Sequence, residues 1–262
     1  MSKRKSSTSA SAALIKPDGV SLSVRLFYLR DMTYSAAQLA KFMKGQSFVM
    51  SQDEPTHGFA NVEVSGNTVS AEFIASFRIP IYSFERGRLV KIEEPSFTVK
   101  RGTVIVKIDR NFVEVRGSDR IASRFRTVLR REEIARMAPL SITKEARTVF
   151  DDIKRRDKAN ISYVLLTDMD KTKIAFTHAE FKGDNIQNAS EINLYQQRYN
   201  GNIARFSGVF PYSSSKKLMK TTVNFKVGAM SIFPFDPKGI SPKDLRWLVT
   251  MLENSADPYP AS

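Results

Sequence analysis

The chain has 262 residues, 42% of them hydrophobic, with 18 Phe, 8 Tyr, no Cys and a formal net charge of +14 at pH 7. This composition supports a packed core and excludes a disordered polyelectrolyte, and the absence of cysteine excludes disulfides and thiolate metal sites. The longest apolar runs are far shorter than the roughly 20 residues that cross a bilayer. We therefore expect an intracellular protein, in the cytoplasm or with the nucleoid or nucleus, that does not enter a membrane.

The first 17 residues are rich in lysine and serine and contain no acidic residue. They lack the apolar run of a secretory signal and show no hydrophobic periodicity. A binding arm, a weak transit-like peptide and an expression remnant all remain open for this segment. We expect residues 1–17 to form a basic, disordered tail.

The next segment predicts a strand, a helix and a run of strands. The stretch "SLSVRLFYLR" has a strand pattern, and "TYSAAQLAKFMKG" is typical of a short helix with Thr33 as its N-cap. From Phe59 the residues alternate in polarity around a Ser-Gly-Asn turn, which predicts a hairpin. Up to Arg116, the groups "ERGR", "EEP", "KRG" and "DRN" are expected to separate short strands of an antiparallel meander.

A helix is predicted over residues 118–136. Ile121, Phe125, Val128 and Leu129 fall within about a third of a turn at 100° per residue. Ser118 is a suitable N-cap, and Pro139 ends the pattern. A second helix is expected from Ser141 or Thr143 through "KEARTVFDDIKRRDK".

The remaining residues repeat the order of strands followed by a helix. "ISYVLLTD" and "KTKIAFTHAEFKG" predict two strands joined at "MD", and "NASEINLYQQRYN" predicts a helix. "GNIARFSGVFPY" and "LMKTTVNFKVGAMSIFPF" predict further strands. "SPKDLRWLVTMLENS" predicts a closing amphipathic helix with Ser241 as its N-cap and Pro242 at its first position.

These elements predict an α+β fold in two similar-sized halves, with antiparallel sheets that are each backed by a C-terminal helix. The N-terminal domain would span residues 18–138 and the C-terminal domain residues 160–262. Residues 139–159 would form a helical linker, because Pro139 breaks the chain there and "DDIKRRDKAN" is highly charged.

Positive charge is concentrated in the predicted helix and the strand before it. Residues 78–136 carry 15 basic and 8 acidic side chains, a net charge of +7. A solvated helix face usually mixes the two signs, whereas arginine presents a planar fork that matches phosphate oxygens. We take the helix as a candidate phosphate-binding element, with Arg116, Arg120, Arg124, Arg126, Arg130 and Arg131 as its contact residues.

A second basic segment, residues 192–235, contains no acidic residue and interleaves lysine and arginine with aromatic residues. Such a pattern is typical of a groove that holds a nucleic-acid backbone and stacks bases. Most of its Phe residues are expected to pack in the core, because strands favour aromatic side chains there. The loop "PYSSSKKLMK" is expected to be exposed, which makes Tyr212, Lys216, Lys217 and Lys220 candidate contacts.

One catalytic pattern competes with the binding hypothesis. Glu180 and Lys182 form Glu-x-Lys on a predicted strand, and Asp168 ends the strand before it, as in metal-dependent nucleases of the restriction-endonuclease type. This pattern is weak in such a charged chain, and a solvated hairpin explains it as well. His57 and His178 lack a phosphoesterase context, and two His without Cys make a zinc site improbable. No phosphate-binding or dinucleotide-binding glycine motif is present.

We therefore predict a non-enzymatic protein that binds DNA or RNA, without catalytic residues, metal or cofactor. Two alternatives remain open. One is the nuclease that uses Asp168, Glu180 and Lys182. The other is a basic protein-interaction module that docks on an acidic partner or on a second copy of the chain in a homo-oligomer.

Overall fold

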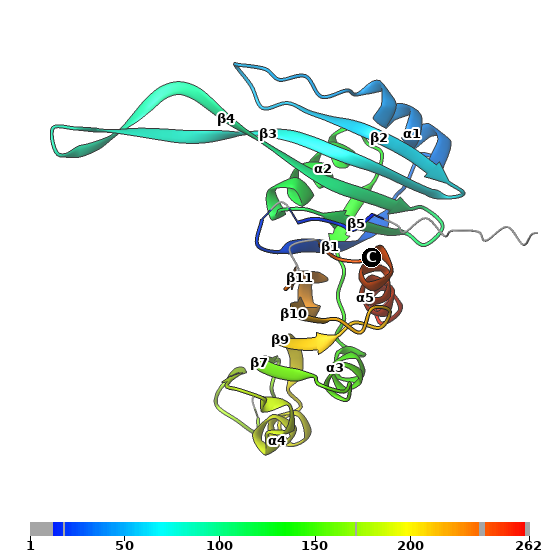
Figure 1. The fold of residues 1–262 in the computed structure, drawn as a ribbon, viewed down its shortest axis with the longest axis vertical. Coiled ribbons are helices and arrows are strands. Elements are labelled where there is room, and N and C mark those ends of the chain that lie inside the picture. Colours follow the sequence, from blue (N-terminus) through cyan, green and yellow to red (C-terminus); the bar gives the residue numbers. More distant parts are fainter. Residues whose placement is uncertain (1–12, 18, 171, 236–238, 260–262) are drawn as a thin grey trace, which may run out of the picture.

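A computed structural model describes residues 13–17, 19–170, 172–235 and 239–259, without the side chains of residues 93–95 (Figure 1). Eleven strands in this part of the chain form one sheet, in the order β2-β3-β4-β5-β1-β11-β10-β9-β7-β8, with β6 paired to β1. All the strand pairs are antiparallel. The predicted α+β class with antiparallel strands is confirmed. The strands form one continuous sheet instead of separate sheets, because β1 pairs with both β5 and β11.

The N-terminal half contains six strands and two helices. Its longest strand, β4, runs through the predicted "EEP" and "KRG" turns without turning there and pairs with β3, the next longest. Pro80 and Pro95 instead lie at a shift of register between the two strands, where a missing backbone N–H costs no ladder hydrogen bond. The elements are β1 (Leu22–Arg30), α1 (Ala36–Gly45), β2 (His57–Ser65), β3 (Thr68–Glu85), β4 (Arg88–Lys107), β5 (Phe112–Arg116), α2 (Asp119–Arg131) and β6 (Arg136–Pro139).

The C-terminal half contributes the other five strands and three helices. Its last helix begins as predicted, since the Ser241 hydroxyl accepts a hydrogen bond from the Lys243 backbone N–H and Pro242 takes the first position. The elements are α3 (Ala146–Lys154), β7 (Asn160–Thr167), β8 (His178–Lys182), α4 (Ser190–Arg198), β9 (Asn202–Pro211), β10 (Leu218–Asn224), β11 (Ala229–Phe233) and α5 (Pro242–Asn254), with 3-10 turns at Ile186–Asn188 and Phe225–Val227.

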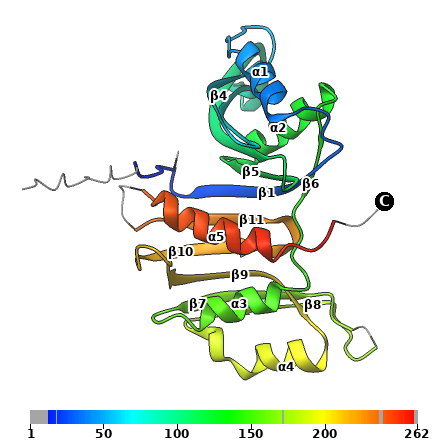
Figure 2. The same ribbon diagram turned by 90° about the vertical axis from the view of Figure 1, so that its right-hand side faces the viewer.

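The helices α2 and α5 pack on opposite faces of the sheet. Successive side chains of a strand point to opposite faces. In β1, Leu22, Val24 and Leu26 belong to the core that α3 and α5 cover, whereas Phe27 and Leu29 belong to the core that α1 and α2 cover. Figures 1 and 2 show α3 and α5 together on one side of the C-terminal strands. We call the two sides the α2 face and the α5 face.

This arrangement leaves the C-terminal strands open on the α2 face. Side chains on that side of β9, β10 and β11 are partly or fully exposed, while their neighbours along each strand are buried. The pattern follows from the period of two in a strand that is covered on one side only. The open surface is part of the same face as helix α2.

Part of the predicted basic tail lies within the described residues. Ile15 and Ile240 exchange two backbone hydrogen bonds of 2.8 and 2.9 Å, and Ile15 packs against the C-terminal core. The chain is therefore already attached to the body at residue 15. The remainder of the predicted tail, residues 1–12, lies outside the described residues.

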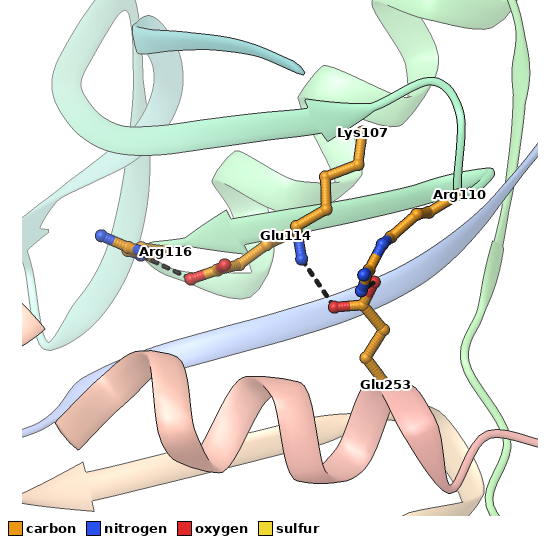
Figure 3. Close-up of polar contacts among 5 residues, drawn as sticks. All are labelled: Lys107, Arg110, Glu114, Arg116 and Glu253. Atoms are coloured by element: carbon orange, nitrogen blue, oxygen red, sulfur yellow. Dashed lines mark hydrogen bonds and ion pairs between the residues drawn. The ribbon is translucent and has the colours of Figure 1, made fainter. Parts of the chain in front are cut away.

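An ion-pair cluster links the N-terminal half to α5 (Figure 3). The Glu253 carboxylate accepts hydrogen bonds from Lys107 Nζ at 2.6 Å and from Arg110 Nη1 at 3.0 Å. The Glu253 side chain is only 8% exposed, so its charge depends on these two cations for compensation.

Replacing Glu253 by Gln should destabilise the protein, because two cations lose a partly buried carboxylate. We expect the free energy of unfolding to fall by about 1–3 kcal/mol in urea titrations. Asp184→Asn, at an exposed position, is the control and should change it by less than about 0.5 kcal/mol. Equal stability of the two variants would contradict a role for this cluster in joining the halves.

Candidate nucleic-acid interface

Helix α2 forms the predicted amphipathic helix, but it is shorter than predicted. Gly117 turns the chain out of β5 with a φ of 151°, and the helix ends at Arg131 instead of Arg136. Glu133 takes a left-handed φ of 53°, and the chain then enters β6 to pair with β1. The predicted core positions are confirmed, since Ile121, Phe125, Val128 and Leu129 are all buried.

The arginines of α2 divide into two groups. Arg120 lies over the Phe77 ring at 4.6 Å and donates to the Arg78 carbonyl at 3.4 Å. Arg124 donates to the Pro55 carbonyl at 2.9 Å. These two side chains are held against the body. The second group, Arg126, Arg130 and Arg131, is exposed, and no carboxylate among the described residues lies within ion-pair distance of it.

Arg116 lies outside helix α2 and on the other face of the sheet. It is the last residue of β5, and its Nε donates to Glu114 at 2.5 Å (Figure 3). Glu114 pairs with Leu26 across the sheet, which places Arg116 on the α5 face. Arg116 is therefore not aligned with the arginines of α2, because the four-residue spacing of a helix does not continue into a strand.

Tyr212 is a core residue, which corrects the prediction that it is exposed in a binding loop. Its ring is fully buried, stacks on Phe210 at 5.6 Å and meets Trp247 edge-on at 5.4 Å. Its hydroxyl lies 2.8 Å from the Thr221 hydroxyl, and burial raises its pKa. The alternation of β9 continues past Pro211, so Phe210 and Tyr212 point to the same buried side.

The lysines that follow Tyr212 are exposed, as predicted. The Asp244 carboxylate of α5 accepts hydrogen bonds from the backbone N–H groups of Ser214 and Ser215, both at 3.0 Å. This contact fixes the turn that presents Lys216 and Lys217. Lys220 lies on β10, on the α2 face, with its Nζ 5.9 Å from the centre of the Phe233 ring.

The open α2 face of the C-terminal strands carries a basic surface that sequence reasoning only partly identified. Arg205 of β9 and Lys220 of β10 are exposed there, and neither has a carboxylate partner among the described residues. The pair Ser207 and Thr222, whose hydroxyls lie 2.7 Å apart, lies between them on this face. Sequence analysis missed Arg205, although its position two residues before Ser207 follows the polar alternation of a strand face.

Two further cations near this face are paired with carboxylates. Arg25 Nη2 lies 2.5 Å from Asp119 at the start of α2. Lys226 Nζ lies 3.0 Å from Asp168, and this hydrogen bond lowers the pKa of the Asp168 carboxyl. The exposed cations of the α2 face without a carboxylate partner among the described residues include Arg126, Arg130 and Arg131 on the helix and Arg205 and Lys220 on the open strands.

The residues of the nuclease hypothesis are held in separate interactions. Asp168 is bound by Lys226 and Thr167, whereas Glu180 interacts with Tyr163 and with Lys182 at 3.2 Å. Glu180 pairs with Leu165, three residues before Asp168, which corresponds to about 10 Å along a strand. Within the described ranges, no group of three or more His, Cys, Asp or Glu side chains could hold a metal ion.

Comparisons with known proteins give no family. No protein-family model matches the chain, and a search of curated proteins found no significant match. Among the described residues, no helix is long and apolar enough to cross a membrane. The functional argument therefore depends on the geometry of the site alone.

His57 lies beneath this interface and gives a test based on pH. Burial lowers its pKa, the nearby Arg124 guanidinium lowers it further, and its Nε2 has no hydrogen-bond partner within the described structure. The unfolded chain therefore binds the imidazole proton more readily than the folded protein does. The contribution of neutral His57 to the free energy of unfolding is fully present above its unfolded pKa of about 6.5, and it is lost as pH falls through the folded pKa.

We expect the urea midpoint of the wild-type protein to fall between about pH 7 and pH 5. The decrease should be smaller in His57→Gln, which cannot titrate in this range. Parallel pH profiles of the two proteins would show that His57 does not contribute.

Proposed function

We propose that this protein binds nucleic acid, DNA or RNA, without catalysis, through phosphate contacts on the α2 face. The observation that carries the proposal is the set of five exposed cations without a carboxylate partner on one face of one sheet. Their mutual repulsion is unfavourable unless a polyanion is present. The set consists of Arg126, Arg130, Arg131, Arg205 and Lys220.

The five cations suit a phosphate backbone better than a single small anion. They come from α2, β9 and β10, and strands β1 and β11 lie between α2 and the β9–β10 pair. Adjacent strands are about 4.8 Å apart, so the set extends over several strand widths. Backbone phosphates are spaced along a comparable length, and each contact releases bound counterions. An intracellular location, in the cytoplasm or with the nucleoid or nucleus, accompanies this proposal.

The double substitution Arg205→Gln, Lys220→Gln tests whether the open strands β9 and β10 contact phosphate. The slope of log affinity against log salt should decrease by up to about 1.8, since each duplex phosphate contact contributes about 0.9. Fluorescence anisotropy with labelled duplex DNA, single-stranded DNA and RNA measures it. The control, Lys144→Gln with Lys158→Gln, removes the same charge from exposed side chains outside the interface.

An unchanged slope in the folded double variant would show that β9 and β10 are not part of the interface.

Competition separates nucleic-acid binding from docking on an acidic protein or on a second copy of the chain. Unlabelled nucleic acid should displace the probe far better than an equal charge concentration of polyglutamate. Equal displacement by the two polyanions would contradict the proposal.

A further inference from the structure

The strands β3 and β4 extend beyond the body of the protein as a two-stranded arm (Figure 1). Pairing of β2 with β3 stops at Ala75, while β3 and β4 remain paired with each other as far as Glu85 and Arg88. The register shift at Pro80 separates the arm from the rest of the sheet. We define the arm as the residues beyond this shift, 81–92.

The arm exposes large apolar side chains on both of its faces. Phe84 and Leu89 are opposite each other across the two strands, and they are 74% and 71% exposed. An isolated two-stranded hairpin is marginally stable in water, and exposed apolar groups of this size mark binding surfaces. The other exposed apolar residues of the arm are Ile81, Tyr82, Val90 and Ile92.

The charge of the arm indicates a negatively charged partner. Its cations are Arg86, Arg88 and Lys91, and its one acid is Glu85, so its net charge is +2. The next two residues of the chain, at 93 and 94, are glutamates and lie toward the body. A second copy of this chain, with a net charge of +14, complements such an arm poorly.

The arm also adjoins the proposed nucleic-acid interface. At its root, Arg120 of α2 lies over Phe77 and donates to the Arg78 carbonyl. In Figure 1 the arm projects away from α3 and α5, toward the side on which the C-terminal strands are open. Nucleic acid held on the α2 face would therefore have the arm next to it.

The dimensions and chemistry of the arm match the major groove of duplex DNA. Each strand of the arm has five residues, or roughly 17 Å, and the major groove is about 12 Å wide and admits a two-stranded β-ribbon. Apolar side chains there contact the methyl group of thymine. The major groove of an RNA duplex is too deep and narrow for this insertion.

We propose that the arm inserts into the major groove of double-helical DNA, with Phe84 and Leu89 against thymine methyl groups and the arm's cations toward the phosphates. The proposal rests on the proposed function and makes duplex DNA its substrate. Phosphate contacts on α2 and the open strands supply most of the affinity. The arm supplies the preference for DNA and for thymine.

The test uses a T-rich DNA duplex, the same duplex with uracil in place of thymine, and the matching RNA duplex. Wild-type protein should bind the thymine duplex at least several-fold more tightly than either of the others. The variant Phe84→Ser, Leu89→Ser should bind all three alike, with the salt slope of the wild type, because no charge is removed. Both residues lie outside the two cores, so the unfolding midpoint should not change.

Equal binding of the thymine and uracil duplexes by the wild type, or an unchanged preference in the variant, would overturn the arm proposal. A wild-type dimer that becomes a monomer in the variant, measured by light scattering, would assign the arm to a second copy and would also overturn it. These results leave the proposed function intact if salt-dependent binding persists. Absence of any nucleic-acid binding by the wild type would instead refute the proposed function itself.

Discussion

Replacing Arg126, Arg130 and Arg131 by Gln is expected to weaken nucleic-acid binding by about two orders of magnitude at 100 mM salt. The slope of log affinity against log salt should decrease by up to about 2.7, because three duplex phosphate contacts are lost at about 0.9 each. Gln keeps the helix propensity near that of Arg, and all three side chains are exposed, so α2 should remain folded.

The matched control removes three positive charges on the other side of the sheet. Arg147→Gln, Arg155→Gln and Lys158→Gln lie on or just after α3, which packs on the α5 face. This variant should keep nearly the wild-type slope, since long-range effects of net charge are screened within about 10 Å at 0.1 M salt. Equal losses in the two triple variants would show that net charge, and not the α2 face, determines binding.

Replacing Tyr212 by Ala is expected to lower the free energy of unfolding by about 3–5 kcal/mol, as for other large core residues. The ring fills space between Phe210 and Trp247, and its removal leaves a cavity. Tyr212→Phe retains the ring but leaves the buried Thr221 hydroxyl without this partner, at a cost of about 1–2 kcal/mol. Urea titrations followed by the single Trp measure both values.

The control for Tyr212 is Lys216→Gln in the adjacent exposed turn, which should change stability by less than about 0.5 kcal/mol. A Tyr212→Ala variant with wild-type stability and impaired nucleic-acid binding would contradict the assignment of Tyr212 to the core.

Local sequence signals predicted which segments form helices, although α1 is capped by Ser35 instead of Thr33 and α3 begins only at Ala146. The apolar spacing of Ile121, Phe125, Val128 and Leu129 gave the buried side of α2, because the helical period is a property of the segment itself. The start of α5 was also predictable from the local sequence, because it depends on the Ser241 cap and on Pro242. The end of α2 was not predicted, because β6 is fixed by pairing with β1, a contact between distant segments.

The errors and omissions in the candidate site have long-range causes. Tyr212 was assigned to the solvent from its polar neighbours, whereas the continued alternation of β9 places it under Trp247. Arg205 and Lys220 share one face only through the register of β9 with β10. The opposite placement of α2 and α5 depends on the alternation of β1, which both cores share. None of these relations is contained in a single segment.

The long arm was missed for a related reason. The groups "EEP" and "KRG" are turn signals, but β4 continues through both because its pairing with β3 resumes on each side of the register shift. A proline at such a shift carries little penalty, so it does not end the strand. Strand pairing, and not local turn composition, determined the length of this hairpin.

The central claim, phosphate binding on the α2 face, is tested most directly with the wild-type protein and no substitution. Anisotropy titrations with labelled duplex DNA, single-stranded DNA and RNA would be made from 50 to 400 mM salt, after a high-salt wash that removes co-purified nucleic acid. We expect log affinity to fall linearly with log salt, with a slope of about −4.5 on duplex DNA if all five cations contact phosphate at about 0.9 each. No binding at 50 mM salt, or binding that does not depend on salt, would contradict the account.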